Sequence, residues 1–201
     1  MSAFPTVARL FCLVSETDDL SLLSALADAG IDGFQVRAKA LTTRDLVALT
    51  RAVLDAVAPY DAQVIVDDRV DVALAAGAHG VHLGADDLAV ADARRLAPDL
   101  LVGATCRHRA AIEAAAADGA DYAGFGPVFA TDSKAGLPAP LGPDALTSAA
   151  GVLPLIAIGG IGATTAGTVR AAGAHGIAVI GAIWRHPDPV SAAKELVTAV
   201  A

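Results

Sequence analysis

One short phrase, written four times along the chain, restricts the possible folds more than any other feature. Its copies occupy residues 29–33, 76–80, 118–122 and 172–176, and each has a glycine in second position. Each copy follows an alanine-rich segment with helical periodicity and precedes a short apolar run, at residues 34–37, 81–84, 123–126 and 177–180. A glycine just beyond a helix adopts the left-handed conformation that ends it. Each phrase therefore predicts a junction between a helix and a strand.

The spacing of these junctions predicts eight strands. The copies lie roughly 45 residues apart, nearer two strand–helix units than one, and regular self-similarity indicates a repeat architecture. A second set of apolar runs falls between them, at residues 10–15, 63–67, 100–105 and 153–158. Strands alternating with helices in this way predict one α/β domain over residues 1–201, a (β/α)8 TIM barrel. Functional residues in such a barrel gather at the carboxyl ends of the strands.

The composition fits a buried aliphatic barrel and no membrane span. Hydrophobic residues make up 55% of the chain and aromatic residues only 4%. Residues 145–168 carry no charged side chain, but glycines and a proline interrupt them, so we expect a buried strand and a turn there. The amino terminus lacks the basic and apolar regions of a secretion signal.

Charge and cysteine content narrow the expected partners. A net charge of −8 argues against nucleic acid, whereas an anionic small molecule can still bind where cations cluster locally. Cys12 and Cys106 fall on predicted strands that are not neighbours, so we expect no disulfide and a reducing compartment. We expect a cytoplasmic protein that binds small molecules, with no nucleic acid and no membrane. A homo-oligomer stays open, because the sequence does not give the oligomeric state.

Acidic side chains follow the third and fourth predicted strands. Asp67 and Asp68 end the first of these, and Asp86 and Asp87 follow the second. Helix capping accounts for about one acid at each place, but not for two. Asp68 and Asp87 on neighbouring strands predict a site for one hard cation, and Mg²⁺ fits because it takes one or two carboxylates and completes its shell with water and phosphates.

The second predicted strand leads into a polar row. With the alternation of a strand, Gln35, Arg37 and Lys39 share one side, where polar groups need a ligand or partner charges. Two interpretations stay open. The row binds an anion, or it forms an ion-pair network with a neighbouring strand.

Three further segments suggest phosphate binding. The long irregular segment after the sixth strand contains Thr131, Asp132, Ser133 and Lys134, a weak signal because surface loops are commonly rich in such residues. The seventh and eighth strands end in glycine, including Gly160 and Gly181, where backbone N–H groups often hold a phosphate in barrels. The rim therefore predicts two anion sites, a cationic one for a pyrophosphate and a neutral glycine-rich one for a monophosphate. That pairing indicates group transfer between two phosphorylated partners.

The histidines are interpreted as structural. His79 and His175 occupy the fourth position of the repeated phrase, at the end of the barrel away from the rim, and we expect them on the surface. His82 alternates with two glycines and is expected inside the barrel, with a structural role.

Taken together, these motifs resemble the thiamine-phosphate synthase family. The likeness rests on residues 35–39, 68–75, 80–84 with Asp87, 126–127 with 131–134, and 158–161, in order from about residue 10 to the end. The resemblance implies a transferase of thiamine biosynthesis with Mg²⁺ as cofactor. It would join an aminopyrimidine-methyl pyrophosphate to a thiazole phosphate, giving thiamine phosphate and pyrophosphate.

The resemblance also assigns roles to residues. It places Asp68 and Asp87 on the metal, and it implies that Arg37, Lys39 and Lys134 stabilise charge on the leaving pyrophosphate, while no catalytic acid or base is assigned. The implied substrate-binding residues are Gln35, Arg37, Lys39, Asp67, Thr105 and Lys134 for the pyrimidine pyrophosphate, and Thr131, Asp132, Ser133, Gly160, Ile180 and Gly181 for the thiazole phosphate.

Four positions depart from the family pattern. Asp67 stands for the usual Asn, Ala85 for Gln, Gly181 for Ser, and Arg107 for the His that follows Thr105 by two places. The first adds negative charge beside the expected pyrophosphate, and the third removes a hydroxyl donor from the thiazole-phosphate side.

Other functions remain as alternatives. A sister group with the same fold, the thiazole tautomerases, uses a His at the place of Arg107 and usually lacks the metal carboxylates, whereas this chain keeps Asp68 and Asp87. A non-catalytic barrel that binds thiazole phosphate is the second alternative. A sugar-phosphate epimerase is disfavoured, because it needs paired acid–base residues around one carbon.

Overall fold

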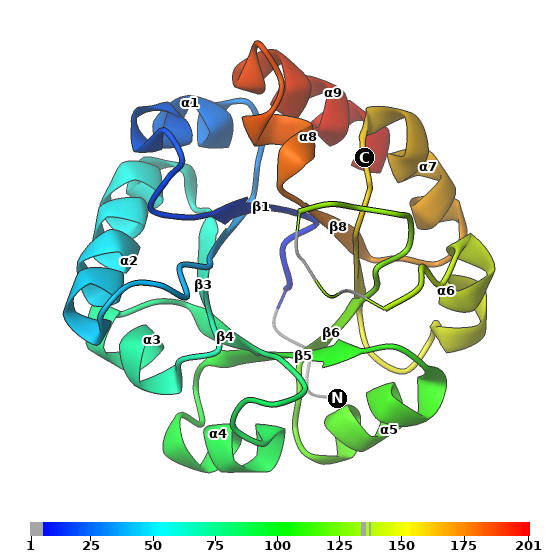
Figure 1. The fold of residues 1–201 in the computed structure, drawn as a ribbon. Helices are drawn as coiled ribbons and strands as arrows, with labels where there is room; N and C mark the ends of the chain where they lie inside the picture. The colour runs from blue at the N-terminus through cyan, green and yellow to red at the C-terminus, as the bar shows by residue number, and fades with distance from the viewer. Residues whose placement is uncertain (1–5, 134–135, 137) are drawn as a thin grey trace.

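Eight parallel strands close into a barrel in the computed structural model, which describes residues 6–133, 136 and 138–201 (Figure 1). Each strand pairs with the next along the chain, and β8 pairs with β1. The predicted barrel is confirmed, and the strand bounds differ from the predicted ones by one or two residues at most. The strands are β1 Leu10–Val14, β2 Gly33–Val36, β3 Gln63–Asp67, β4 Gly80–Leu83, β5 Leu101–Cys106, β6 Tyr122–Phe125, β7 Leu155–Ile158 and β8 Gly176–Val179.

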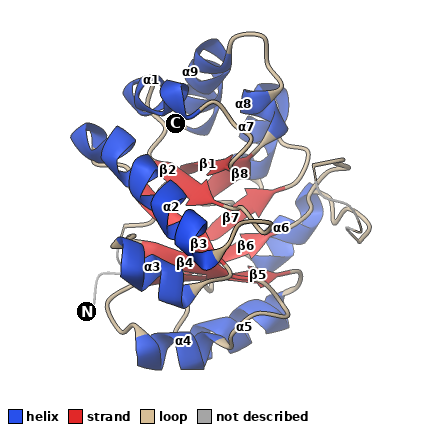
Figure 2. Ribbon diagram, turned by 60° about the vertical axis from the view of Figure 1, so that its left-hand side comes forward, coloured by secondary structure: helices blue, strands red, loops and turns tan. Residues whose placement is uncertain are grey.

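Helices surround the barrel and cover its outer face (Figures 1 and 2). They are the 3-10 turns η1 Leu20–Leu22 and η2 Ala58–Tyr60 and the α-helices α1 Leu23–Asp28, α2 Thr43–Val57, α3 Val70–Ala76, α4 Val90–Leu96, α5 Arg109–Ala117, α6 Pro143–Ala149, α7 Ala163–Ala171, α8 Gly181–Trp184 and α9 Pro189–Val200. None of the helices in the described ranges is long and apolar enough to cross a membrane.

The longest helix shows how local sequence sets an element and its packing. The side chain of Thr42 caps α2 by accepting a hydrogen bond from the backbone N–H of Asp45 at 3.3 Å. Leu46, Leu49 and Val53 then recur at helical spacing, and all three are buried against the barrel. The cap begins the helix, and the apolar stripe holds it against the barrel.

The interior of the barrel has its own small core. Phe11, Leu13, Ile65, Tyr122 and Ile156 are buried in one apolar cluster inside the strands. A larger cluster lies between the strands and the surrounding helices. The interior cluster fills the barrel, so that only its carboxyl end is left for a ligand.

The repeated phrase also stabilises the amino end of the barrel. In its first copy, the carboxylate of Asp32 accepts hydrogen bonds from the backbone N–H groups of Arg9 at 2.9 Å and Leu10 at 2.8 Å, where β1 begins. In the third copy, Asp121 accepts from the N–H of Val102 at 2.8 Å, where β5 begins. The polar fourth position thus satisfies donors of a neighbouring strand that would otherwise lack partners.

The two histidines at this position make similar contacts. His79 Nδ1 accepts a hydrogen bond from the N–H of Val64 at 2.9 Å, at the second residue of β3. His175 is half-buried, and its Nε2 donates to the carbonyl oxygen of Val7 at 2.8 Å. The expectation of a plain surface residue is therefore wrong for His175, which ties the segment before β1 to the barrel.

Candidate active site

A pocket of about 540 Å³ opens at the carboxyl ends of the strands. Its walls include every predicted substrate-binding residue that the structure describes, namely Gln35, Arg37, Lys39, Asp67, Thr105, Thr131, Asp132, Ser133, Gly160, Ile180 and Gly181, together with Asp68. Lys134 lies outside the described residues. Stretches far apart in the sequence therefore meet at one mouth, as a barrel rim predicts.

The polar row on β2 faces acidic residues of β3. Gln35 is buried, and its Nε2 donates to Asp67 Oδ1 at 2.5 Å. Arg37 Nε lies 3.5 Å from Asp67 Oδ2, and Lys39 Nζ lies 2.6 Å from Asp68 Oδ2. The ion-pair interpretation is thus what the structure shows, and the same side chains still line the pocket.

Asp67 is buried beneath this row. Burial, and after it the charge of Asp68, raise the pKa of the Asp67 carboxyl to about 7, while Gln35, Arg37 and Lys39 oppose the rise. The extra negative charge expected from Asp at this position is therefore only partly present near neutral pH.

Asp68 and Asp87 face one another across the β3 and β4 ends. Asp68 adopts a left-handed backbone, with φ +67°, and its N–H donates to the carbonyl oxygen of His82 at 2.8 Å. Asp87 Oδ2 accepts from the N–H of Gly84 at 2.7 Å. A methyl group on Gly84 would lie 2.7 Å from Asp87 Oδ2 and 4.0 Å from Asp68 Oδ1, so both carboxylates turn toward this glycine. A strained backbone at this point orients a side chain toward the pocket.

The two carboxylates share protons and charge unequally. Burial, and then the hydrogen bond to Asp68, raise the pKa of Asp87. Burial would also raise the pKa of Asp68, but the hydrogen bonds from Lys39 and Asp87 lower it overall. We take the shared proton to reside on Asp87, because Lys39 stabilises the charge on Asp68.

This donor set fits a magnesium ion. Two carboxylates within hydrogen-bond reach repel each other unless a proton or a cation lies between them. Among the described residues, no group of three or more His, Cys, Asp or Glu side chains is placed to hold a metal ion. A pair of carboxylates beside an open pocket is the set that Mg²⁺ uses when water and phosphate complete its shell.

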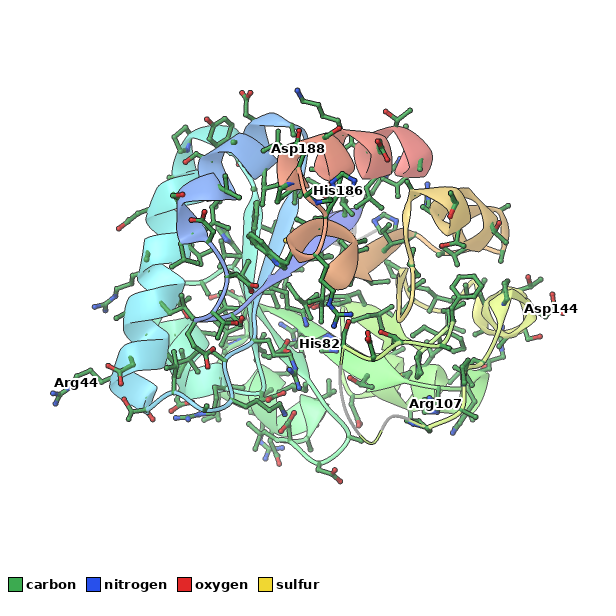
Figure 3. The ribbon with its side chains drawn as sticks, turned by 45° about the horizontal axis from the view of Figure 1, so that its top comes forward. Arg44, His82, Arg107, Asp144, His186 and Asp188 are labelled. Carbon is green, nitrogen blue, oxygen red and sulfur yellow. The ribbon has the colours of Figure 1, made fainter. Side chains whose placement is uncertain are left out.

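A hydrogen-bonded chain runs from the barrel interior to the pocket. Tyr122 is buried, and its hydroxyl lies 3.2 Å from His82 Nδ1, while His82 Nε2 lies 3.0 Å from Thr105 Oγ1. Burial lowers the pKa of His82 to about 4, against a smaller effect of Asp68. The imidazole is neutral near pH 7 and holds the hydroxyl of Thr105 in place. In Figure 3, His82 lies within the ring of strands. Its predicted interior position is confirmed.

The described parts of the segment between β6 and α6 lie over the barrel mouth (Figure 1). Its two ends pair through the N–H of Leu141, which donates to Pro127 at 2.9 Å. Arg107 joins the same two ends, donating to the carbonyl oxygens of Gly126 and Ala139, both at 2.9 Å. Figure 3 shows Arg107 beside this segment. The arginine therefore braces the loop, a role that its place in the sequence did not reveal.

The turn after β7 packs against that loop. Gly160 has φ +65°, and a methyl group there would lie 2.4 Å from the carbonyl oxygen of Ala130 and 2.9 Å from Phe129 Cβ. Glycine at this position permits the close approach of the two loops, and it also leaves the backbone N–H open to an anion. The sequence suggested only the second reason.

Arg185 is a pocket residue that the sequence analysis missed. It follows α8, lines the pocket, and its Nη1 lies 2.6 Å from Asp132 Oδ1. A methyl group on Gly181 would lie 3.3 Å from Arg185 Cδ and 3.4 Å from its Nε. The one signal available in the sequence was a basic residue one helical turn after Gly181, which begins α8.

Comparison with known proteins gives one consistent result. Residues 10–183 match the model of a family described as thiamine monophosphate synthase. A thiamine-phosphate synthase of Chlorobium phaeovibrioides is 48% identical over 166 residues, which cover 81% of this chain and 79% of that protein. A thiamine biosynthesis bifunctional protein of Symbiobacterium thermophilum is 45% identical over 194 residues. That alignment covers 95% of this chain, which spans only 40% of the bifunctional protein.

A solved structure agrees with these relatives. The thiamine phosphate pyrophosphorylase from Pyrococcus furiosus superposes with a TM-score of 0.87 at 33% sequence identity, and the match covers 96% of this chain and 95% of that one.

Proposed function

The chain belongs to the thiamine monophosphate synthase family, and we propose that it joins an aminopyrimidine-methyl group to the ring nitrogen of a thiazole phosphate. The observation that carries the proposal is the convergence, in one pocket, of two sides: Arg37 and Lys39 after β2, paired with acids of β3, and glycine-rich turns after β7 and β8. The products are thiamine phosphate and pyrophosphate. As a family member the chain is a transferase of thiamine biosynthesis.

The reaction needs charge stabilisation more than proton transfer. The bond between the methylene carbon and the pyrophosphate oxygen breaks, and its electron pair leaves with pyrophosphate. The thiazole nitrogen then gives its lone pair to the methylene carbon and becomes quaternary, so no base is required at that nitrogen. This agrees with a pocket whose described residues include cations and hydroxyls. The hydrogen bond between His82 and Thr105 is not needed as a nucleophile–base pair, because the thiazole nitrogen supplies its own lone pair.

The cationic side would hold the pyrophosphate ester. Arg37 and Lys39 line the pocket beside Asp67 and Asp68, which keep their charged groups in place before substrate binds. Preorganised charges of this kind act where charge develops on the leaving group, and removal of one lowers kcat by about 10²–10³-fold. Lys134 is proposed as a third such cation. Gln35 and Thr105 would bind the pyrimidine from the barrel side.

Asp68 and Asp87 are proposed to hold Mg²⁺. The bound ion would supply positive charge to the pyrophosphate oxygens. The carboxylates orient toward the Gly84 turn at the pocket edge, and Lys39 already balances part of their charge at 2.6 Å from Asp68.

The glycine-rich side would hold the thiazole phosphate. Gly160, Ile180 and Gly181 line this side, and the neighbouring β6–α6 segment adds Thr131 and Ser133 to the pocket wall. Thr131 Oγ1 accepts from the N–H of Ser133 at 3.2 Å, which gives the start of the loop a defined turn.

Pyrophosphate release tests the proposal and its metal. The native chain, Asp87→Ala and the control Asp86→Ala are assayed with both substrates, with Mg²⁺ and with the metal chelated. Neither Asp86 nor Asp87 is among the residues that line the pocket, but Asp87 contacts Asp68 and the N–H of Gly84, whereas Asp86 is exposed. We expect native activity to require Mg²⁺, Asp87→Ala to lose about 10²-fold or more, and Asp86→Ala to keep native activity.

Other results have distinct meanings. Release that neither chelation nor Asp87→Ala alters would refute the metal assignment. Exchange of a thiazole-phosphate proton without the pyrimidine substrate would indicate a tautomerase. Binding of thiazole phosphate without any turnover would indicate a non-catalytic barrel.

We also propose a cytoplasmic location. Support comes from Cys12 and Cys106, which are buried free thiols on β1 and β5. A homo-oligomer is compatible with this proposal, and sedimentation of the purified chain would define its state.

A further inference from the structure

Arg185 fills space that a larger side chain at position 181 would occupy. Gly181 begins α8, and Arg185 follows the last residue of that helix, so the two lie one turn apart. A methyl group on Gly181 would approach Arg185 Cδ, Nε and Cζ at 3.3, 3.4 and 3.5 Å. The guanidinium therefore lies directly over the glycine at the pocket wall.

One loop residue orients this guanidinium. Asp132 Oδ1 accepts from Arg185 Nη1 at 2.6 Å, and Asp132 belongs to the segment between β6 and α6. Both side chains are more than half exposed, at 57% and 83%, so the pair contributes little to folding stability. Among the described residues the guanidinium has no other hydrogen bond or ion pair, which leaves most of its donors to a ligand.

The charges of the pocket are divided between two sides. Arg37 and Lys39 on the β2 side pair with Asp67 and Asp68. Within the described part of the pocket wall, Arg185 is the one cation on the side of β6, β7 and β8. A planar guanidinium contacts two phosphate oxygens at once and adds a full positive charge, which backbone N–H groups lack.

We infer that Arg185 binds the phosphate group of the thiazole substrate, and that Asp132 acts as a positioning residue for it. This inference rests on the proposed function. It gives a physical reason for Gly181: the missing side chain makes room for a longer and charged donor from the next turn. Asp132, expected as a substrate-binding residue, acts instead through Arg185, since its own negative charge disfavours direct contact with phosphate.

The test compares two acceptors, the thiazole phosphate and the same thiazole alcohol without phosphate. Variants Arg185→Ala and Arg185→Lys are assayed at saturating pyrimidine substrate. For Arg185→Ala we expect KM for the phosphate to rise about 10–100-fold, with kcat/KM for the alcohol within about 2-fold of native. For Arg185→Lys we expect a KM for the phosphate between those of the native chain and Arg185→Ala, because lysine keeps the charge but lacks the planar guanidinium.

Asp132→Asn should raise KM for the phosphate about 3–10-fold in the native background and have no effect in Arg185→Ala, because a positioning residue acts through its partner. The control is Arg109→Ala, an exposed arginine on α5 that pairs with Glu113 and lies outside the pocket walls. It should match the native chain with both acceptors.

Equal losses with phosphate and alcohol would overturn the inference and reduce Arg185 to a latch between loops. No change in either KM would overturn it as well. Calorimetric binding of thiazole phosphate to the full chain separates this inference from the proposed function. Weaker binding by Arg185→Ala supports the phosphate contact even where the native chain gives no turnover, a result that would refute only the synthase activity.

Discussion

At the scale of single residues, the site depends on polar groups whose charge is set by burial. His82 is a case outside the charged row. Its imidazole lies between Tyr122 and Thr105, and burial keeps it neutral with a pKa of about 4. In the unfolded chain its pKa is 6.5. Between about pH 4 and pH 6.5, His82 is therefore protonated in the unfolded state but neutral in the folded state.

This difference predicts a pH-dependent stability. The contribution of neutral His82 is complete above pH 6.5 and is lost as the pH falls toward about 4. His82→Gln removes the titration, so the stability advantage of the native chain over the variant should shrink by about 2 kcal/mol between pH 7 and pH 4.5. Urea unfolding of both proteins at several pH values measures it. An advantage that stays constant over this range would show that His82 does not resist protonation in the fold.

At the scale of elements, the mouth is made by loops that pack on each other. The turn after β7 approaches the β6–α6 segment so closely that Gly160→Ala would place a methyl group 2.4 Å from the Ala130 carbonyl oxygen, at a φ of +65°. We expect the variant to lose about 2 kcal/mol of unfolding free energy. Gly167→Ala, on the exposed face of α7 with open space around it, should instead gain about 0.5–1 kcal/mol. Thermal unfolding gives both values, and equal shifts would refute the packing argument.

The same scale shows what sequence predicts and what it does not. The strands and their carboxyl ends follow from local patterns, so Gln35, Asp68 and Thr131 were placed at one mouth without coordinates. The contact of Arg185 with Asp132 joins residues 53 apart in sequence and depends on how two loops converge. The local periodicity of helices and strands does not predict a contact between residues so far apart in the sequence. Arg107 is similar, because its partners lie 19 and 32 residues away.

At the scale of the whole molecule, the two ends of the barrel divide stability from function. Hydrogen bonds from the repeated phrase hold the amino end, while the pocket occupies the other. The sequence shows that all four copies of the repeated phrase have Asp or His at the fourth position. The sequence pattern predicted surface positions for the two histidines and did not reveal that Asp32 and His79 accept hydrogen bonds from N–H groups near the start of the preceding strand.

Asp32 provides the test of this division. Its carboxylate accepts two backbone hydrogen bonds where β1 begins, from Arg9 and Leu10, and β1 also closes the barrel against β8. Asp32→Ala should lower the unfolding free energy by about 2 kcal/mol, because both N–H groups lose a charged acceptor at a partly exposed site. Asp28→Ala, on an exposed acid at the end of α1, should change it by less than about 0.5 kcal/mol. Below the melting temperature, KM for both substrates should stay native in each variant, since neither side chain lines the pocket. If Asp32→Ala is no less stable than Asp28→Ala, or if it alters KM while fully folded, the amino end does not have the purely structural role assigned to it.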